Sequence, residues 1–163
     1  MTLKFIATTE LGRLSKWLRI LGYDVAYETS NQKAKISLKS LREDRIILTR
    51  NLHFFKPTSH KVLFVKSTNY KDQLKQVIKD LNLKINKDNM FIRCVMCNEY
   101  LREIAKDRVK DKVPPYVFKT HNDFMQCKEC QRIYWSGTHW LNVDKILEDH
   151  KIKKTTLKNK GKT

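Results

Sequence analysis

Cys94-Val95-Met96-Cys97 and Cys127-Lys128-Glu129-Cys130 decide how this chain is organised, because together they use every cysteine in the sequence. Four thiolates in two close pairs suit a tetrahedral metal site, since each pair can wrap one edge of the ion. The flanking segments 124–126 and 132–135 are typical of one β-strand that leads into the second pair and another that leaves it. The sequence therefore predicts a zinc ribbon in which a structural Zn²⁺ is held by Cys94, Cys97, Cys127 and Cys130.

Two other uses of four cysteines compete with zinc. Disulfides within Cys-x-x-Cys pairs are mostly redox-active, and the sequence shows no secretory signal, so an oxidised ribbon is disfavoured. An iron–sulfur cluster also takes four thiolates and stays an alternative. In either metal site all four positions come from the protein, which leaves none for substrate or water and indicates a structural role.

The charge of the chain indicates a polyanionic partner. Its 34 Lys and Arg residues against 17 Asp and Glu residues give a net charge of +17, and cations that neutralise phosphates release condensed counterions. Nucleic acid is the favoured partner over an anionic membrane, because no apolar run reaches the length of a spanning helix. Solvated lysines explain part of the excess, but less well the tail 151–163, which carries six lysines and no acid. The tail is expected to be a disordered basic arm that contacts phosphate.

Hydrophobic periodicity predicts an α/β fold in the first half of the chain. Apolar runs predict strands at 3–7, 22–27, 45–49 and 62–65, the last two buried on both faces. Helical spacing predicts helices at 10–22, 32–43 and 70–81. The first helix is expected to turn the stripe Leu11, Leu14, Leu18 and Leu21 inward and to end at Gly22, and the second to bury Ile36 and Leu41. Strands that alternate with helices indicate a parallel sheet.

The expected organisation has three parts. Residues 1–85 form the α/β domain, residues 91–150 form the zinc ribbon with a short closing helix, and residues 151–163 form the basic tail. The polar stretch 86–89 marks the boundary between the first two parts. In the closing helix, Val143, Ile146 and Leu147 are expected to face inward.

The first helix also bears on localisation. Arg13, Lys16 and Arg19 fall on the side away from the leucine stripe, and an arginine-rich amphipathic start can mimic a mitochondrial presequence. A folded helix is favoured because a strand precedes it. The expected localisation is intracellular and cytoplasmic, with an organelle as the alternative.

Several segments together resemble the Mut-seven C-terminal ribonuclease domain family. They run in unbroken order from about Phe5 to Leu147: Phe5, Leu11 to Asp24, Arg45 to Arg50, Gln73-Leu74, Arg93 to Asn98, Val113-Pro114 and Ile133 to His139. The resemblance implies a PIN-like three-layer α/β/α sandwich with a parallel sheet, followed by a small zinc ribbon. It also implies zinc on the four cysteines and RNA as partner.

The same resemblance implies metal-assisted phosphodiester hydrolysis, but the ligands for that chemistry are depleted. In the family pattern, carboxylates at the carboxyl ends of parallel strands hold Mg²⁺ or Mn²⁺. This chain has Thr8 and Asn51 at two of those positions, and a third falls near Lys33 and Ala34. Neutral oxygens bring no negative charge to offset the dehydration of a small divalent ion. The chain is therefore expected to lack catalytic residues.

Nearby acids could substitute for the missing ligands. The candidates are Glu10, Asp24, Glu28, Glu43 and Asp44. Asp24 is the weak favourite because it lies in the matched Gly-Tyr-Asp segment, although a loop or capping role fits it equally. Glu10 is expected to offset the dipole of the first helix.

The basic residues around this degenerate site, together with those of the tail, form the expected RNA-binding surface. Each could be an ordinary solvated charge, but as a group they can follow a phosphate backbone; they are Arg13, Lys16, Arg19, Arg50, Lys151, Lys153 and Lys154. In the ribbon, Tyr134, Trp135, His139 and Trp140 either stack bases or pack the ribbon against its neighbour. Packing is favoured for Trp135.

Three functions follow from the sequence. The favoured one is a catalytically inactive RNA-binding protein on a nuclease-derived fold, acting as a component or factor of a ribosome, with rRNA as partner, or of another ribonucleoprotein. The second is a divalent-metal endoribonuclease with rearranged ligands, which alone requires Mg²⁺ or Mn²⁺. The third is a scaffold whose zinc ribbon docks a protein partner.

Overall fold

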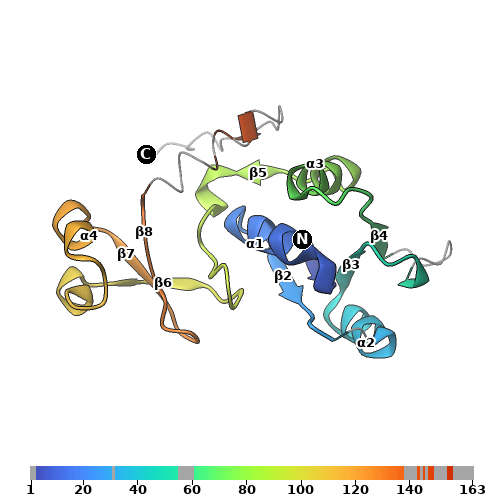
Figure 1. Ribbon diagram of the computed structural model, residues 1–163, viewed down its shortest axis with the longest axis horizontal. Coiled ribbons are helices and arrows are strands. Elements are labelled where there is room, and N and C mark those ends of the chain that lie inside the picture. Colours follow the sequence, from blue (N-terminus) through green and yellow to red (C-terminus); the bar gives the residue numbers. More distant parts are fainter. Residues whose placement is uncertain are drawn as a thin grey trace, which may run out of the picture.

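A four-stranded parallel sheet forms the first half of the chain (Figure 1). The computed structural model describes residues 3–30, 32–54, 61–137, 143, 145, 147–148 and 154–155. The strands are β1 (Lys4–Ala7), β2 (Asp24–Tyr27), β3 (Arg45–Thr49) and β4 (Val62–Phe64), in the order β2-β1-β3-β4. The expected parallel α/β arrangement is confirmed. Because β1 and β3 are neighbours although β2 lies between them in sequence, the chain reverses its direction across the sheet between these two strands.

Three helices cover the two faces of this sheet. A short 3₁₀ turn, η1 (Thr9–Leu11), leads into α1 (Gly12–Ile20), and α2 (Lys33–Glu43) and α3 (Tyr70–Asp80) follow. Phe5 and Ala7 pack with α1 and α3, whereas Ile6 between them packs with Ile36 of α2. Alternate residues of one strand thus face opposite helical layers, as the pleat of a strand requires.

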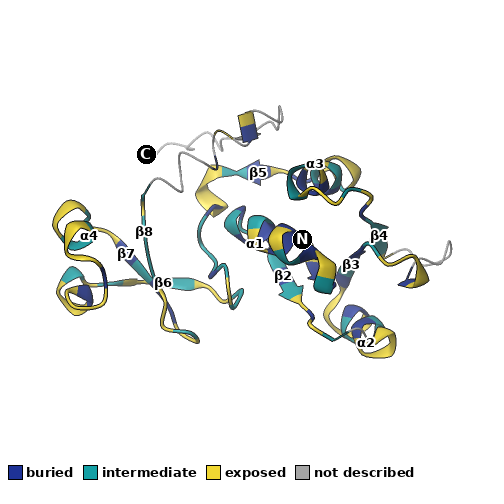
Figure 2. Ribbon diagram, viewed as in Figure 1, coloured by how far each residue is buried: buried dark blue, intermediate teal, exposed yellow. Residues whose placement is uncertain are grey.

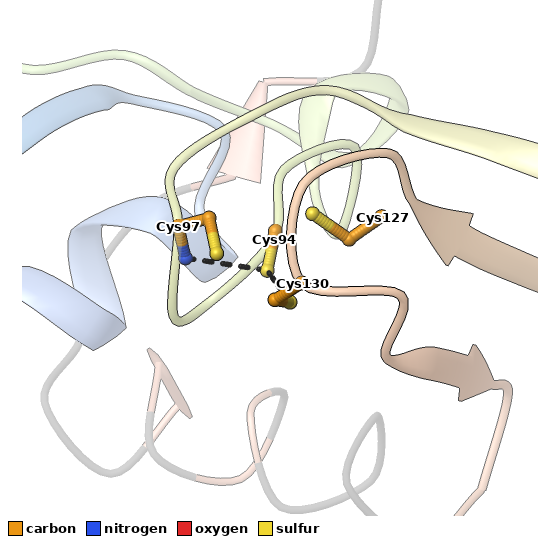
Figure 3. A group of neighbouring side chains, drawn as sticks. All are labelled: Cys94, Cys97, Cys127 and Cys130. Atoms are coloured by element: carbon orange, nitrogen blue, oxygen red, sulfur yellow. Dashed lines mark hydrogen bonds between the residues drawn. The ribbon is translucent and has the colours of Figure 1, made fainter.

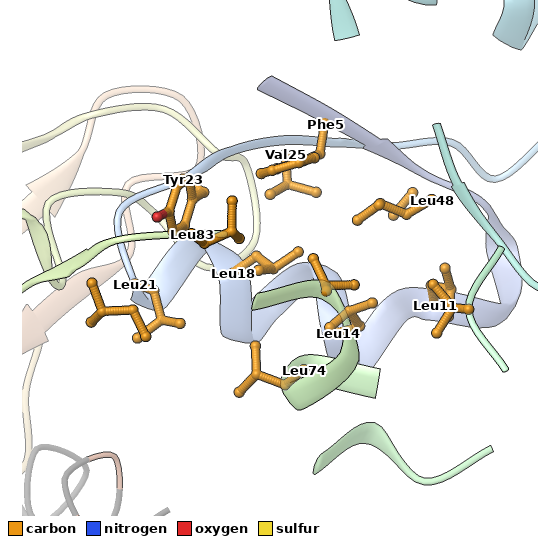
Figure 4. Close-up of a cluster of buried hydrophobic side chains, with 14 of the residues drawn as sticks. Phe5, Leu11, Leu14, Leu18, Leu21, Tyr23, Val25, Leu48, Leu74 and Leu83 are labelled. Carbon is orange, nitrogen blue, oxygen red and sulfur yellow. The ribbon is translucent and has the colours of Figure 1, made fainter. Parts of the chain in front are cut away.

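The leucine stripe of the first helix is the centre of the larger core. Leu11, Leu14, Leu18 and Leu21 are all buried, as predicted. Figure 4 shows them in a row along α1, facing the side chains of Phe5, Val25 and Leu48 on the sheet. Exposed residues gather on the outer sides of the helices (Figure 2).

The four-stranded sheet and its three helices are called the α/β body below. Two details of this body differ from the predictions. Leu41 is 73% exposed, because the buried positions of α2 are Ile36 and Ser40, and Leu41 lies well round the helix from them. The strand β4 is half-buried along its length, because in the described sheet it lies at the edge beside β3 and not between two strands.

The second half of the chain forms a three-stranded antiparallel sheet. Its strands are β6 (Leu101–Ile104), β7 (Phe124–Cys127) and β8 (Ile133–Trp135), with β7 in the centre. Between β6 and β7 the chain makes the 3₁₀ turn η4 (Lys106–Val109) and the helix α4 (Pro115–Thr120). Val109, Val113 and Phe124 form the small core under this sheet. The strands on both sides of the second cysteine pair are therefore confirmed, and this sheet with the cysteine loops is called the ribbon below.

The chain passes from the α/β body to the second sheet across the end of α1. The connection consists of β5 (Ile85–Asn86) and the 3₁₀ turn η3 (Lys87–Asn89). Gly22, which follows α1, has a φ of +92°, and a Cβ on it would lie 2.1 Å from the Asn89 carbonyl oxygen. Only glycine fits this position, because the backbone of η3 lies directly against it. The Phe91 amide then donates to the Ile20 carbonyl over 2.8 Å.

Arg19 holds the first cysteine pair against the α/β body, and this overturns its predicted place on an exposed face. Its side chain is 5% exposed. Nε and Nη2 donate to the Val25 carbonyl at 3.0 and 2.7 Å, and Nη1 donates to the carbonyls of Val95 and Met96 at 2.8 and 2.9 Å. Arg19 is therefore a structural residue, and it is not available to RNA phosphates.

The C-terminal residues that the structure describes return to the α/β body. Val143 and Leu147 are buried in the main core, as predicted, while Ile146 lies outside the described residues. Lys154–Thr155 form β9, which pairs in parallel with β5. At these two residues the chain differs from the expected disordered arm, because the backbone of β5 offers donors and acceptors for a further strand. No helix within the described ranges has the length and the apolar character needed to cross a membrane.

The role of Arg19 predicts a large effect of its replacement on stability. Arg19→Met keeps the aliphatic stem but leaves three backbone carbonyls without their donors, so the free energy of unfolding should fall by about 2–4 kcal/mol. Urea denaturation followed by circular dichroism measures it. Lys16→Met, on the exposed face of the same helix, is the control and should change the free energy by less than about 0.5 kcal/mol. Equal stability of the two variants would contradict the role assigned to Arg19.

Candidate functional site

The four cysteines meet in one cluster between the two halves of the chain (Figure 3). Their sulfur atoms all lie within 4.8 Å of one another, and the Sγ atoms of Cys94 and Cys130 are 3.6 Å apart. Cys94 and Cys127 are buried, and Cys97 and Cys130 are half-buried. None of the four is joined to another by a disulfide in the structure.

The cluster has the size and donor set of a tetrahedral metal site. A Zn–S bond of about 2.3 Å places two sulfur ligands roughly 3.8 Å apart, close to the separation of Cys94 and Cys130. Burial, reinforced by the neighbouring thiols, raises the pKa of Cys97 to about 12. Because crowded thiols resist joint ionisation, a bound cation would be needed to keep all four as thiolates. The four cysteines can therefore hold Zn²⁺, and they leave no ligand position for a substrate.

Two aromatic residues of β8 support the cluster and the ribbon. The Tyr134 hydroxyl lies 3.1 Å from Cys94 Sγ, and burial together with this sulfur raises the pKa of Tyr134. Trp135 packs against Val109 and Phe124 in the ribbon's own core, and not against the neighbouring α/β body as predicted. His139 and Trp140 lie outside the described residues.

A second site lies at the carboxyl ends of β1 and β3, where the sheet changes direction. In open α/β sheets this is the usual place for a ligand. Thr8 directly follows β1, and its amide donates to the Leu48 carbonyl of β3 over 3.1 Å. Asn51 follows β3, and its Oδ1 accepts from the His53 amide over 2.9 Å, at the start of the 3₁₀ turn η2 (Leu52–Phe54). The residues at the two best-aligned family positions are thus at the expected edge, and both are neutral.

Glu10 turns back toward this edge, which the sequence did not predict. Its Oε1 accepts from the hydroxyls of Thr8 and Thr49 at 2.6 and 3.0 Å and from the Arg50 amide at 2.8 Å. Desolvation raises the pKa of Glu10, but these hydrogen bonds outweigh it and lower the pKa to about 2. The residue lies in the 3₁₀ turn η1 before α1, so its carboxylate binds the strand ends and does not simply offset a helix dipole. Its Oε1 is fully engaged by protein donors.

Asp24 lies at the opposite edge, so its candidacy as a substitute metal ligand is wrong. It begins β2, where it pairs in register with Lys4 at the start of β1. Its Oδ1 accepts from Arg45 Nη1 at 2.6 Å and from Asn98 Nδ2 at 2.8 Å. Burial raises the pKa of Asp24, but these two partners outweigh it and hold the pKa below its usual value. Asp24 is a structural anion that ties the ribbon to the amino edge of the sheet.

The remaining acids near the sheet have cationic partners. Glu28, which follows β2 at the carboxyl edge, is 2.6 Å from Lys39 Nζ and 3.9 Å from Lys35 Nζ. Glu43 pairs with Arg45 at 2.5 Å, and Asp44 pairs with Lys61. Among the residues that the structure describes, the four cysteines are the only group of three or more side chains placed to hold a metal ion. At the carboxyl edge Thr8 and Asn51 are neutral, and the carboxylates of Glu10 and Glu28 are engaged by protein donors. These residues fit Mg²⁺ or Mn²⁺ poorly, because such an ion is usually held by one or two carboxylates that are free to bind it.

The basic residues predicted to bind RNA fall into three groups. Arg13 and Lys16 are exposed on α1, as expected. Arg50 is half-buried at the end of β3, and its Nε is buried without a hydrogen-bond partner among the described residues. Lys151 and Lys153 lie outside the described residues, and only the backbone of Lys154 is described, in β9.

The sequence did not single out Lys33 as a basic site residue. It is the first residue of α2, and its Nζ donates to the His53 carbonyl just after Asn51. Nζ also lies 5.9 Å from the centre of the Phe54 ring. The sequence did carry one indication of this role, because Lys33 lies near the third acidic position of the family pattern. A lysine there puts a positive charge where a metal ion would need a carboxylate.

The cysteine cluster predicts stoichiometric zinc that depends on Cys94. Purified, reduced protein should contain one Zn²⁺ per chain by elemental analysis, and Cys94→Ser should lose most of it and lower the melting temperature. Met96→Ser alters the exposed residue inside the same Cys-x-x-Cys loop and should keep its zinc. Iron in place of zinc would support the iron–sulfur alternative, and metal-free wild-type protein would remove the site.

The hydrogen bonds of Glu10 predict a specific dependence of stability on pH. A carboxylate whose pKa is about 2 in the folded state, and near 4.5 when unfolded, stabilises the fold above pH 4.5 and loses this contribution as the pH falls toward 2. Glu10→Gln should cost roughly 1 kcal/mol at pH 7, a value reduced for solvent screening of this exposed residue. The difference from wild type should shrink between pH 4.5 and 2 in denaturation measurements. Glu103→Gln, exposed on β6, should follow wild type throughout; an unchanged Glu10→Gln curve would contradict the assignment.

Comparison with known proteins connects these two sites. A family model described as the Mut7-C RNAse domain matches residues 3–147, which include the whole parallel sheet, both cysteine pairs and Leu147. In the searches of curated proteins and of solved structures, nothing matches the chain. The family match covers most of the chain and agrees with the resemblance seen in the sequence. The chain belongs to the Mut7-C RNAse domain family.

Proposed function

We propose that this protein binds RNA on a PIN-like ribonuclease fold without cleaving it, as a component or factor of a ribosome or another ribonucleoprotein. The observation that carries the proposal is the chemistry of the carboxyl edge. Thr8 and Asn51 offer neutral oxygens, and the carboxylate of Glu10 accepts hydrogen bonds from Thr8, Thr49 and the Arg50 amide. A divalent ion would have to break those bonds to gain the carboxylate of Glu10, and the other carboxylate at this edge, Glu28, is paired with Lys39.

The charges around the edge favour phosphate over metal. Lys33 Nζ binds the carbonyl of His53 beside Asn51, and the buried Nε of Arg50 lacks a partner among the described residues. A phosphate oxygen is the type of acceptor that such a guanidinium N–H binds well. Arg13 and Lys16 extend the basic surface along α1. Cations at these positions repel Mg²⁺ and attract an RNA backbone.

The structure supports the PIN-like interpretation through its layers. Helices α1 and α3 pack on one face of the parallel sheet and α2 on the other, as a three-layer sandwich requires. The net charge of +17 supports RNA in large assemblies, because each neutralised phosphate adds affinity through counterion release. We place rRNA first among the partners for this reason.

The proposal predicts RNA binding without cleavage. Labelled single-stranded and structured RNA incubated with the pure protein and Mn²⁺ should stay intact, while fluorescence anisotropy should show binding that weakens steeply with salt. Three phosphate contacts on a single strand would give a slope of log K against log salt of about −2. Lys33→Gln and Arg50→Gln should each weaken binding and reduce the slope, whereas Lys119→Gln, on the exposed surface of α4, should not.

Two results would contradict this function. Cleavage that requires Mn²⁺ and disappears in Glu10→Gln would establish a ribonuclease with rearranged ligands, for which Glu10 and not Asp24 is the decisive residue. A protein partner that survives nuclease treatment and high salt, with no RNA bound, would establish the scaffold function. The double variant Thr8→Asp/Asn51→Asp is a positive control, since it restores two carboxylates and should increase Mn²⁺ affinity in calorimetry.

A further inference from the structure

A trough of about 1250 Å³ lies between the α/β body and the ribbon, and neither the cysteine cluster nor the carboxyl edge uses it. The body lines it with residues of α1 and α3, and the ribbon lines it with residues from Arg93 to Leu101 and from β7 and β8. Its volume exceeds that of the usual pocket for a small ligand, roughly 300–1,000 Å³. The trough therefore has room for a segment of a polymer.

Aromatic side chains form both walls of the trough. On the body side, Trp17 and Tyr70 stack with their ring centres 5.9 Å apart and their planes inclined by 21°. On the ribbon side, Tyr100 is 59% exposed, and the Arg93 guanidinium lies 4.0 Å from the centre of its ring. Because Arg93 covers one face of the Tyr100 ring, a planar group such as a nucleic-acid base would stack on the other face.

The charge of the trough matches a polyanion. The cationic residues Lys71, Arg132 and Lys145 line it against one acid, Asp123. Arg93 lines it as well, but its guanidinium donates to the carbonyls of Gly22 and Asn98 and lies 4.0 Å from Asp24. Arg13, which begins the exposed basic face of α1, lies 4.5 Å from the Tyr70 ring centre and so links this trough to the basic carboxyl edge. Aromatic faces with basic rims are the combination that binds single-stranded nucleic acid, because bases stack while phosphates meet the cations.

We propose that this trough binds an unpaired segment of RNA, with a base stacked on the free face of Tyr100 and the phosphates directed to Lys71 and Arg132. The inference deepens the proposed function and rests on it, because it names which form of RNA binds and where. In a duplex the faces of the bases stack on one another, so no base face is free to stack on an aromatic side chain of the protein. The trough thus selects loops, bulges or single strands.

The test separates base stacking from phosphate attraction. Three probes are measured by fluorescence anisotropy: a 12-nucleotide oligouridylate, the same length of ribose-phosphate without bases, and a duplex of equal length. Tyr100→Ala should weaken oligouridylate binding by about fivefold or more, the effect of one lost stacking partner. Tyr100→Phe keeps the ring and should bind like wild type. Tyr116→Ala, which alters a ribbon tyrosine that is 74% exposed on α4 and does not line the trough, is the matched control. Zinc content and circular dichroism should be equal in all variants.

The outcomes distinguish this inference from the proposed function. Salt-dependent binding that is equal for the base-free probe and unaffected by Tyr100→Ala would leave RNA binding intact and overturn the trough as its site. Tighter binding of the duplex than of the single strand would overturn it as well. If no probe binds at low salt, the proposed RNA binding is contradicted, and the assignment of the trough as an RNA site is contradicted with it.

Discussion

The contact between the first cysteine loop and the α/β body is the constraint on which the structure depends. Arg19 joins the carbonyl of Val25 in β2 to those of Val95 and Met96 in the loop, and Asn98 Oδ1 accepts from the Val25 amide over 3.0 Å. These groups are backbone atoms of a loop whose shape the cysteines fix. A metal on the four thiolates would therefore stabilise more than the ribbon, because the α/β body buries a charged side chain whose partners exist only when the loop is formed.

Local patterns were sufficient where the partners lie on one helix or one strand. The leucines repeat at helical spacing and the cysteines fall in two close pairs, so the buried stripe along α1 and the gathering of the four cysteines are both confirmed. Arg19 shows where such patterns fail. It lies about 100° round the helix from Leu18, and Arg13 lies equally far from Leu14, so helical spacing does not distinguish the buried arginine from the exposed one. What decides its burial is a loop distant in sequence, Val95–Met96, which no periodicity within α1 can reveal.

The two carboxylates considered as metal ligands show how much depends on strand direction. Asp24 follows the tight turn at Gly22 and therefore begins β2, which places it at the amino edge beside Arg45. Glu10 follows β1, which places it at the carboxyl edge. Its 3₁₀ turn, and not a full helical turn, directs the carboxylate back to Thr8 and Thr49. The order of strand, turn and helix in the sequence is enough to place Asp24 and Glu10 at opposite edges of the sheet. The hydrogen bonds of Glu10 could not be predicted in this way, because they depend on Thr49 of β3, which is distant in sequence.

Under the proposed function, a single physical feature of the carboxyl edge accounts both for RNA binding and for the absence of cleavage. Carboxylates that hold a divalent ion repel phosphate when the ion is absent, so a nuclease site without its metal binds RNA poorly. Neutral Thr8 and Asn51 remove that repulsion, and the remaining carboxylate of Glu10 has its charge met by three protein donors. With Lys33 and Arg50 beside them, the net field at the edge favours an anion. Under the proposed function, neutral side chains at Thr8 and Asn51 would therefore act in two ways: they provide no anionic ligand for a metal, and they leave an edge that an RNA phosphate can approach.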